Sequence, residues 1–202
     1  MNVKFRLAQP DDAAAVSTIY APFCESSHVS FEIVAPSEQQ MRDRIARIGA
    51  QFPWLIGEIE GDVAGYVYAT QHRERAAYRW AVDVAVYVAA EWRRQGLGQA
   101  LYHSLFSILR QQGYCKAFAG ITLPNASSVG LHEALGFRPV AIFPGVGYKL
   151  GRWLDVGWWQ LDLQPEAEHP PEPRLFQDIR DEAAVAAALA VGQRLLQTSQ
   201  TM

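Results

Sequence analysis

Cysteine is scarce in this sequence, with only Cys24 and Cys115 among 202 residues. Two cysteines without metal-ligand spacing predict neither a disulfide framework nor a metal site, so we expect both to be small buried side chains. Long hydrophobic runs are also missing. No stretch approaches the about 18 apolar residues of a membrane span, and Met1 to Leu7 lack an apolar core of secretory length. We therefore expect a cytoplasmic protein with no membrane partner.

A basic excess is absent as well. Lysine and arginine together number 18 against 21 acidic residues, which gives a formal net charge of −3. Binding to a nucleic acid backbone normally needs a clear positive excess, so the composition argues against nucleic acid as the main partner. The 50% hydrophobic and 19% charged residues are the balance of a globular protein. A chain of this length buries enough surface to fold without a disulfide or metal.

What the sequence does contain is a strand, a glycine-spaced turn and a helix in that order. The apolar, β-branched run Trp80–Val88 is typical of a buried central strand, and Leu101, Leu105 and Ile108 recur at helical spacing. The turn between them reads Arg93-Arg94-Gln95-Gly96-Leu97-Gly98-Gln99-Ala100. Glycines let a backbone approach a ligand, and the first N–H groups of the helix favour an anion. The turn predicts a pyrophosphate site, although its glycines could equally just close the connection.

Hydrophobic periodicity along the rest of the chain predicts a mixed α/β fold. Ser37 and Gln40 have the spacing of a capping box and predict a helix that starts there. We expect one domain over residues 1–163, a proline-rich acidic linker over 164–177, and an amphipathic helix and tail over 178–202. Because a lone amphipathic helix must bury its apolar face, this helix should dock on its own domain or on a neighbouring subunit.

Two titratable residues, Asp83 and His132, are candidates for a catalytic role. Asp83 interrupts the apolar strand, and an unpaired carboxylate is expensive there. Either it pairs with an arginine such as Arg79, or burial raises its pKa and it serves as a general base. His132 lies seven residues after Asn125 in a short predicted helix, where a histidine can also be purely structural.

Several separated motifs now resemble one family. The strand ending Val86-Tyr87-Val88, the turn Arg93-x-x-Gly96-x-Gly98, and Asn125 followed by His132 and Gly136-Phe137 resemble the GNAT superfamily of acetyl-CoA-dependent N-acetyltransferases. Within it, residues 123–136 and 147–160 look like the phosphinothricin and methionine sulfoximine acetyltransferases. The resemblance covers Arg6 to Leu163. It implies a mixed, mostly antiparallel sheet of six to seven strands flanked by about four helices, with the C-terminal helix added.

The resemblance also implies how acetyl-CoA is held. Backbone amides from Arg94 to Ala100 would bind the pyrophosphate, with Arg93 or Arg94 adding positive charge. Main-chain groups of the strand would bond the pantetheine arm, and Asn125 would contact that arm. The predicted cofactor-binding residues are Val86, Tyr87, Val88, Arg93, Arg94, Gln95, Gly96, Leu97, Gly98, Gln99, Ala100, Asn125 and Ser128.

The reaction that the resemblance implies is direct attack of the α-amine of an amino acid acceptor on acetyl-CoA. Asp83 stands where the family usually has glutamate, one methylene longer, which favours proton transfer through a water. His132 stands where many members have a tyrosine acid, so it is predicted to serve the leaving thiolate. The predicted substrate-binding residues are Phe31, Arg73, Arg75, Tyr78 and Lys149, although the two arginines also fit a solvated hairpin tip.

Two other functions stay open at this point. An enzyme of the same fold could acetylate a protein N-terminus or another amine. A coenzyme A-binding interaction module could have lost its catalytic base where Asp83 now stands, with the C-terminal helix serving a partner. For the enzyme we expect a homodimer, a small-molecule amine acceptor and no metal.

Overall fold

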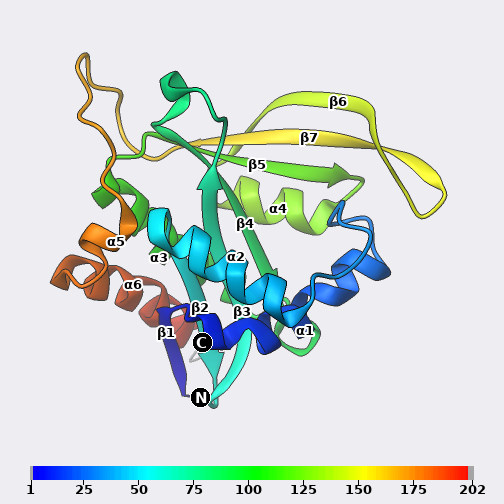
Figure 1. The fold of residues 1–202 in the computed structure, drawn as a ribbon, viewed down its shortest axis with the longest axis horizontal. Coiled ribbons are helices and arrows are strands. Elements are labelled where there is room, and N and C mark those ends of the chain that lie inside the picture. The colour runs from blue at the N-terminus through cyan, green and yellow to red at the C-terminus, as the bar shows by residue number, and fades with distance from the viewer. Residues whose placement is uncertain (1, 200–202) are drawn as a thin grey trace.

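The computed structural model describes residues 2–199, and its centre is one seven-stranded sheet with the order β1-β2-β3-β4-β5-β7-β6 (Figure 1). Only β4 and β5 run parallel to each other; the other neighbours are antiparallel. This confirms the predicted mixed, mostly antiparallel sheet. The strands are β1 (Val3–Leu7), β2 (Trp54–Ile59), β3 (Asp62–Gln71), β4 (Ala81–Val88), β5 (Lys116–Leu123), β6 (Arg138–Lys149) and β7 (Arg152–Asp162).

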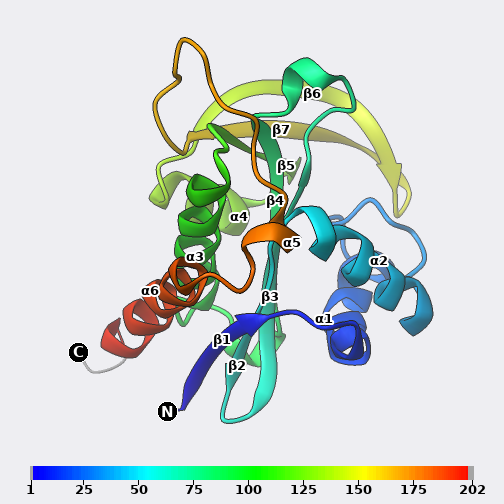
Figure 2. The ribbon, with the colours of Figure 1, turned by 60° about the vertical axis from the view of Figure 1, so that its left-hand side comes forward.

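Helices cover both faces of the sheet, as Figure 2 shows. On one face lie α1 (Ala13–Glu25) and α2 (Glu38–Gln51). On the other lie α3 (Leu97–Gln112), α4 (Ala126–Ala134) and α6 (Ala183–Ser199). The short α5 (Phe176–Ile179) precedes α6.

The start of α2 shows how local sequence sets an element. Ser37 Oγ accepts from the Gln40 N–H at 3.2 Å, and Gln40 Oε1 accepts from the Ser37 N–H at 2.8 Å. These two bonds satisfy amides that have no partner inside the helix, so the predicted capping box is confirmed. Met41, Ile45 and Ile48 then follow at helical spacing and are buried in the core.

The parallel pair β4 and β5 parts soon after it begins. The two strands pair only from Ala81 with Lys116 to Asp83 with Phe118. Beyond Asp83, β4 continues on β3 and β5 continues on β7, so a gap opens between them (Figure 1).

Main-chain groups of β4 line this gap. The Ala89 N–H donates to Ala64 O at 2.9 Å on the β3 side. Because successive residues of a strand point their main-chain groups to opposite sides, those of Val84, Val86 and Val88 face the gap. The same alternation turns the main-chain groups of Tyr87 toward β3, where Tyr87 pairs with Tyr66. The prediction that these groups bond the ligand is therefore wrong.

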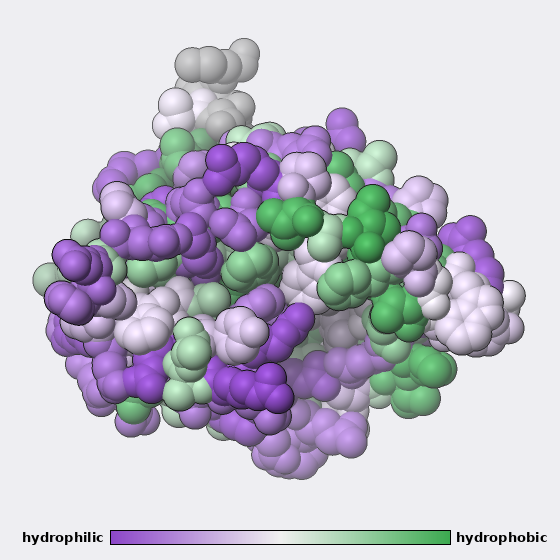
Figure 3. All heavy atoms as spheres, turned by 90° about the horizontal axis from the view of Figure 1, so that it is seen from above, coloured by the Kyte–Doolittle hydropathy of each residue, from purple (hydrophilic) through white to green (hydrophobic). Residues whose placement is uncertain are grey.

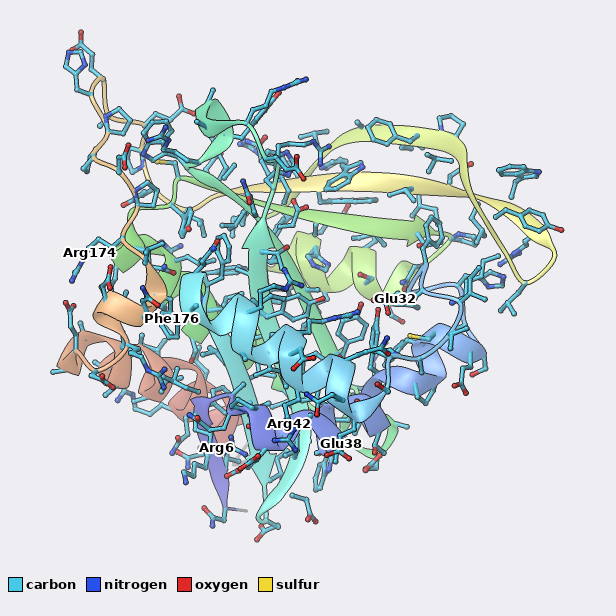
Figure 4. The ribbon with its side chains drawn as sticks, in the orientation of Figure 1. Arg6, Glu32, Glu38, Arg42, Arg174 and Phe176 are labelled. Carbon is cyan, nitrogen blue, oxygen red and sulfur yellow. The ribbon has the colours of Figure 1, made fainter. Side chains whose placement is uncertain are left out.

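The C-terminal segment returns to its own domain. The loop before α5 is held by Trp80 Nε1, which donates to Pro171 O at 2.8 Å, and Phe176 is buried beside the C-terminal end of α2 (Figure 4). The predicted partner of Asp83, Arg79, instead pairs with Glu172 of this loop. The last predicted tail positions, 200–202, lie outside the described residues.

Helix α6 packs on α3 and on β1. The Gly192 N–H donates to Ser104 Oγ at 3.1 Å, and that hydroxyl donates to Leu189 O at 3.1 Å. The Phe5 N–H at the outer edge of β1 donates to Gln193 Oε1 at 3.2 Å. Of the two surfaces predicted for this helix, the structure shows its own domain.

The opposite edge strand, β6, exposes apolar side chains. Ile142 is 59% exposed and Val146 is 55% exposed. Figure 3 looks onto this side of the molecule and shows hydrophobic side chains gathered over the half that contains β6. No helix within residues 2–199 is both long and apolar enough to cross a bilayer.

Candidate active site

The N-terminus of α3 is left uncapped by its own sequence. Gly96 occupies the N-cap position with a φ of 84°, a left-handed conformation that suits glycine, and it has no side chain to satisfy the helix. The N–H groups of Leu97, Gly98 and Gln99 therefore have no acceptor within the helix. The prediction that the Ala100 amide binds a pyrophosphate is wrong, because this N–H already donates to Gly96 O at 3.0 Å.

A cavity of about 680 Å³ opens beside these amides. It lies between the α3 N-terminus, the end of β4 and one face of α4. Its lining contains Arg93 and Arg94, which with the helix dipole make it attractive to an anion. The lining residues are Val88, Trp92, Arg93, Arg94, Gly96, Leu97, Gly98, Gln99, Ala126, Ser127, Gly130, Leu131 and Ala134.

Asn125 and Ser128 stand at the start of α4. Asn125 is the N-cap, and its Oδ1 accepts from the Ser128 N–H at 3.1 Å. Asn125 therefore fixes the helix that forms one wall of the cavity. The residues that actually line the cavity from α4 are mostly small, at positions 126, 127, 130 and 134. Their i, i+4 spacing was a sequence signal for a ligand-facing helix surface.

Asp83 is paired with a histidine rather than with an arginine. Its Oδ1 lies 2.6 Å from Nδ1 of His72, the residue that directly follows β3. Burial raises the pKa of Asp83, and the hydrogen bond to His72 and the positive charge of Arg73 oppose this rise. Thr70 pairs with Asp83 in the antiparallel register, which brings the end of β3 to the carboxylate. The pair sits where β4 and β5 part.

Aromatic rings surround this pair. The His72 ring stacks on Phe118 with centroids 4.3 Å apart, and it meets the edge of Trp158 at 5.9 Å. Arg73 lies over the Trp158 ring at 5.6 Å, and Tyr78 lies 6.1 Å from the His72 ring. The structure thus brings the predicted residues Arg73 and Tyr78 together with Asp83.

Arg75 and Phe31 are not part of this cluster. Arg75 is exposed at the N-cap of the 3-10 turn η2 (Ala76–Tyr78). Phe31 is 40% exposed and lies against Gly147 of β6, where the glycine leaves room for the ring.

His132 is enclosed between α3 and α4 and is 4% exposed. Its Nδ1 lies 2.7 Å from Ser128 O, which can only accept, so Nδ1 carries the proton. Nε2 then accepts from the Tyr102 hydroxyl at 3.0 Å. Burial lowers the pKa of His132, and the bond to Ser128 opposes this. Both ring nitrogens thus have protein partners, and the predicted thiolate role stays a prediction.

Lys149 is also enclosed, with 4% of its surface exposed. Its Nζ donates to the main-chain oxygens of Phe23, Ser30 and Glu32 at 3.1, 2.6 and 2.9 Å. Burial lowers the pKa of this amine. These three bonds hold the end of α1 and the loop that follows it against β6, so a substrate contact by Lys149 stays a prediction. In Figure 4, Glu32 is labelled in this loop.

Two members of the site were absent from the sequence prediction, His72 and Trp158. His72 lies outside the motifs of the resemblance, and Trp158 lies within residues 147–160 but was not singled out there; each reaches the site through strand register. Within residues 2–199, no three His, Cys, Asp or Glu side chains gather in a way that could hold a metal ion.

The geometry therefore combines amides without a helical acceptor at the start of α3, two strands that part, and a half-buried carboxylate where they part. The Acetyltransferase (GNAT) domain family matches residues 5–158 of this sequence. The chain belongs to the GNAT acetyltransferase family, as its motifs predicted.

Several proteins similar to this chain have named acetyltransferase activities. The chain is 42% identical over 171 residues to phosphinothricin N-acetyltransferase of Streptomyces viridochromogenes, which covers 85% of this chain and 92% of that protein. It is 33% identical to the L-methionine sulfoximine/L-methionine sulfone acetyltransferase of Salmonella typhimurium, over 80% of this chain and 95% of that protein. A crystal structure of a phosphinothricin acetyltransferase from Sinorhizobium meliloti in complex with acetyl-CoA has a TM-score of 0.79 and 32% identity, covering 87% of this chain and 99% of that one.

Proposed function

We propose that the protein transfers the acetyl group of acetyl-CoA to the α-amine of an amino acid or analogue, of the phosphinothricin or methionine sulfoximine type. The observation that carries this is the fork of β4 and β5, with an uncapped helix at its open end and Asp83 at its closed end. The names of the relatives support the acceptor class. Residues 1–163 would form the catalytic domain.

The pyrophosphate of acetyl-CoA would bind the free amides of Leu97, Gly98 and Gln99, with Arg93 and Arg94 supplying charge. The pantetheine arm would then enter the gap and meet main-chain groups of Val86 and Val88. An N–H group facing this gap would polarise the thioester carbonyl, and removing such a donor typically costs about 2.7 to 4 kcal/mol.

The acceptor would approach from the side of the His72 and Asp83 pair. Arg73 would hold its carboxylate beside Trp158 and Tyr78, while Arg75, Phe31 and Lys149 remain candidate contacts from the sequence. The amine would lose its proton at the fork, where Asp83 stands, and attack the thioester directly. His132 would serve the departing thiolate after its ring proton moves from Nδ1, which now donates to Ser128 O, to Nε2, which now accepts from the Tyr102 hydroxyl.

The direct test is release of coenzyme A thiol from acetyl-CoA in the presence of phosphinothricin, methionine sulfoximine and a panel of free amino acids. We expect turnover with at least one free amino acid or analogue and little with peptides. A preference for peptide N-termini would favour the protein acetyltransferase alternative. Absence of thiol release together with tight acetyl-CoA binding would favour the interaction module.

Gly96→Val is expected to weaken acetyl-CoA binding at least about tenfold. The residue has a φ of 84°, which a β-branched residue adopts only under strain, so the turn would rearrange and displace the free amides. Calorimetric titration of acetyl-CoA measures the effect. Gly61→Val, at a hairpin turn with a similar φ of 94°, is the matched control and should keep the wild-type affinity. Equal affinity in Gly96→Val would place the anion site elsewhere.

The proposed homodimer would use β6. This edge strand exposes Val140, Ile142 and Val146, and a second copy would remove these apolar side chains from water. Ile142→Lys is expected to shift the protein to monomers in light scattering after size exclusion. Thr198→Lys, exposed on α6, is the control and should leave the mass unchanged. A monomeric wild type would contradict the proposal.

The cytoplasmic location expected from the sequence fits this function. Cys24 and Cys115 are free, buried thiols. The two alternative functions find less support, since the named relatives act on small amino acid analogues.

A further inference from the structure

His72 has the contacts of a base that is held in place. Its ring stacks on Phe118 and makes an edge contact with Trp158, and these contacts restrict its rotation. Its Nδ1 is bonded to Asp83 Oδ1 at 2.6 Å. The side chain is 12% exposed, against 29% for Asp83, so one part of an otherwise buried ring reaches the surface of the site.

The Asp83 bond fixes which nitrogen of the ring can accept a proton. An ionised carboxylate only accepts hydrogen bonds, so Nδ1 must carry the ring proton. Nε2 is then the nitrogen with the free lone pair. Within residues 2–199, Nε2 has no hydrogen-bond partner, in contrast to His132, whose two nitrogens are both engaged.

His72 also lines the space that an acceptor would use. It belongs to a cavity of about 390 Å³ shared with Tyr78, Phe118 and Gln160, and to a second cavity of about 380 Å³ shared with Thr70 and Arg73. No other histidine lines either cavity among the described residues.

We propose that His72 is the general base of the acetyl transfer, and that Asp83 positions its ring and stabilises the protonated form. This inference rests on the proposed function and names the group that completes it. A carboxylate accepts protons in acid solution, whereas an imidazole does so near neutral pH, where an amine must be deprotonated. The short side chain of Asp83 is then suited to holding a histidine between itself and the amine.

Every proton that the acceptor amine loses in the proposed acetyl transfer has a destination. The acceptor arrives as an ammonium ion and gives one proton to Nε2 of His72. The neutral nitrogen forms a bond to the thioester carbon, and the bond from that carbon to sulfur breaks. The proton that nitrogen loses as the amide forms neutralises the thiolate, and the proton on His72 leaves to solvent. No oxidant, reductant or metal takes part in these steps.

Other charged groups face the same space and must be considered in its pH dependence. Asp83 comes from β4 and Arg73 from the loop after β3. Lys116 of β5 and Glu166 of the loop after β7 line the larger cavity and pair with each other at 2.7 Å. The other titratable or charged residues that line the two cavities are Arg47, Glu74, Tyr78 and Cys115.

The test is His72→Phe in the full chain, which keeps an aromatic ring over Phe118 and removes both nitrogens. Turnover with the best acceptor should fall about 100-fold or more, within the usual range for loss of a general base. The affinity for acetyl-CoA, measured by calorimetry, should stay within about twofold because the pyrophosphate site is untouched. In wild type, kcat should fall as the pH is lowered from about 8 to 5, and this acid limb should disappear in the variant.

His72→Gln guards against a packing defect, because its amide can still bond Asp83 but cannot take a proton near neutral pH. It should show the same loss and the same missing acid limb. The double variant His72→Phe/Asp83→Glu should regain part of the turnover, since the longer carboxylate reaches further.

Survival of the acid limb in His72→Gln, or a loss smaller than tenfold in both single variants, would overturn the assignment of His72. The proposed function would still stand in that case, because wild type would still release thiol. Absence of turnover in wild type would overturn the proposed function, and the role of His72 with it.

Discussion

Asp83→Asn is expected to lower kcat about 1,000-fold, in the middle of the range for general base catalysis. The carboxylate lies 2.6 Å from His72 Nδ1 and is the negative charge that balances a protonated ring. An asparagine removes that charge, and its NH₂ group can face Nδ1, which forces the ring proton onto Nε2. The ring would then donate where it must accept.

Steady-state thiol release at saturating acetyl-CoA measures this loss. Asp11→Asn is the matched control, because Asp11 is 93% exposed in its surface ion pair with Arg42, and it should keep wild-type kcat. The acetyl-CoA affinity of Asp83→Asn should not change. A kcat within tenfold of wild type would show that the carboxylate has no part in proton transfer.

Gly192→Ala is expected to destabilise the protein by about 2 to 3 kcal/mol, as overpacking of a close contact does. A Cβ at this position would lie 2.0 Å from Ala100 O and 2.6 Å from Ser104 Oγ. Helix α6 would have to lift from α3, and the bond from the Gly192 N–H to Ser104 would weaken. A loss of stability is unusual for this substitution, because alanine is favoured over glycine inside a helix by about 0.8 to 1.0 kcal/mol.

Urea unfolding followed by circular dichroism measures this change. Gly49→Ala is the matched control, since Gly49 lies inside α2 with nothing within 4 Å of an added Cβ, and it should be neutral or stabilising. Equal behaviour of the two variants would mean that α6 does not pack on α3 as closely as described.

The parts of the fold that were predictable are those set by neighbours in sequence. The Ser37 capping box and the glycine N-cap of α3 depend on residues within one helical turn, so their spacing was sufficient. The family motifs between Trp80 and Gln160 then predicted the mixed sheet. A resemblance to a family predicts which distant strands pair, whereas hydrophobic periodicity predicts only the local element.

The partners of the polar residues were not predictable in this way. His72 reaches Asp83 because Thr70 lies opposite Asp83 in the β3 and β4 register, and nothing in the sequence states that register. Lys149 looked like a cation for a substrate, yet its Nζ donates to three carbonyls of α1 and the loop after it, more than 100 residues earlier. The residue types suggested a catalytic or binding role for Asp83 and Lys149, but their hydrogen-bond partners depend on the fold.

The helix at the C-terminus also bears on the homodimer that we propose. A sheet with two accessible edges can add molecules on both sides and grow into a filament. Here Gln193 occupies an amide on the β1 border, so that border is screened and the far one, β6, is left for contact between copies. In the proposed homodimer, two copies related by a twofold axis would meet through this single edge, and the assembly would end at two molecules.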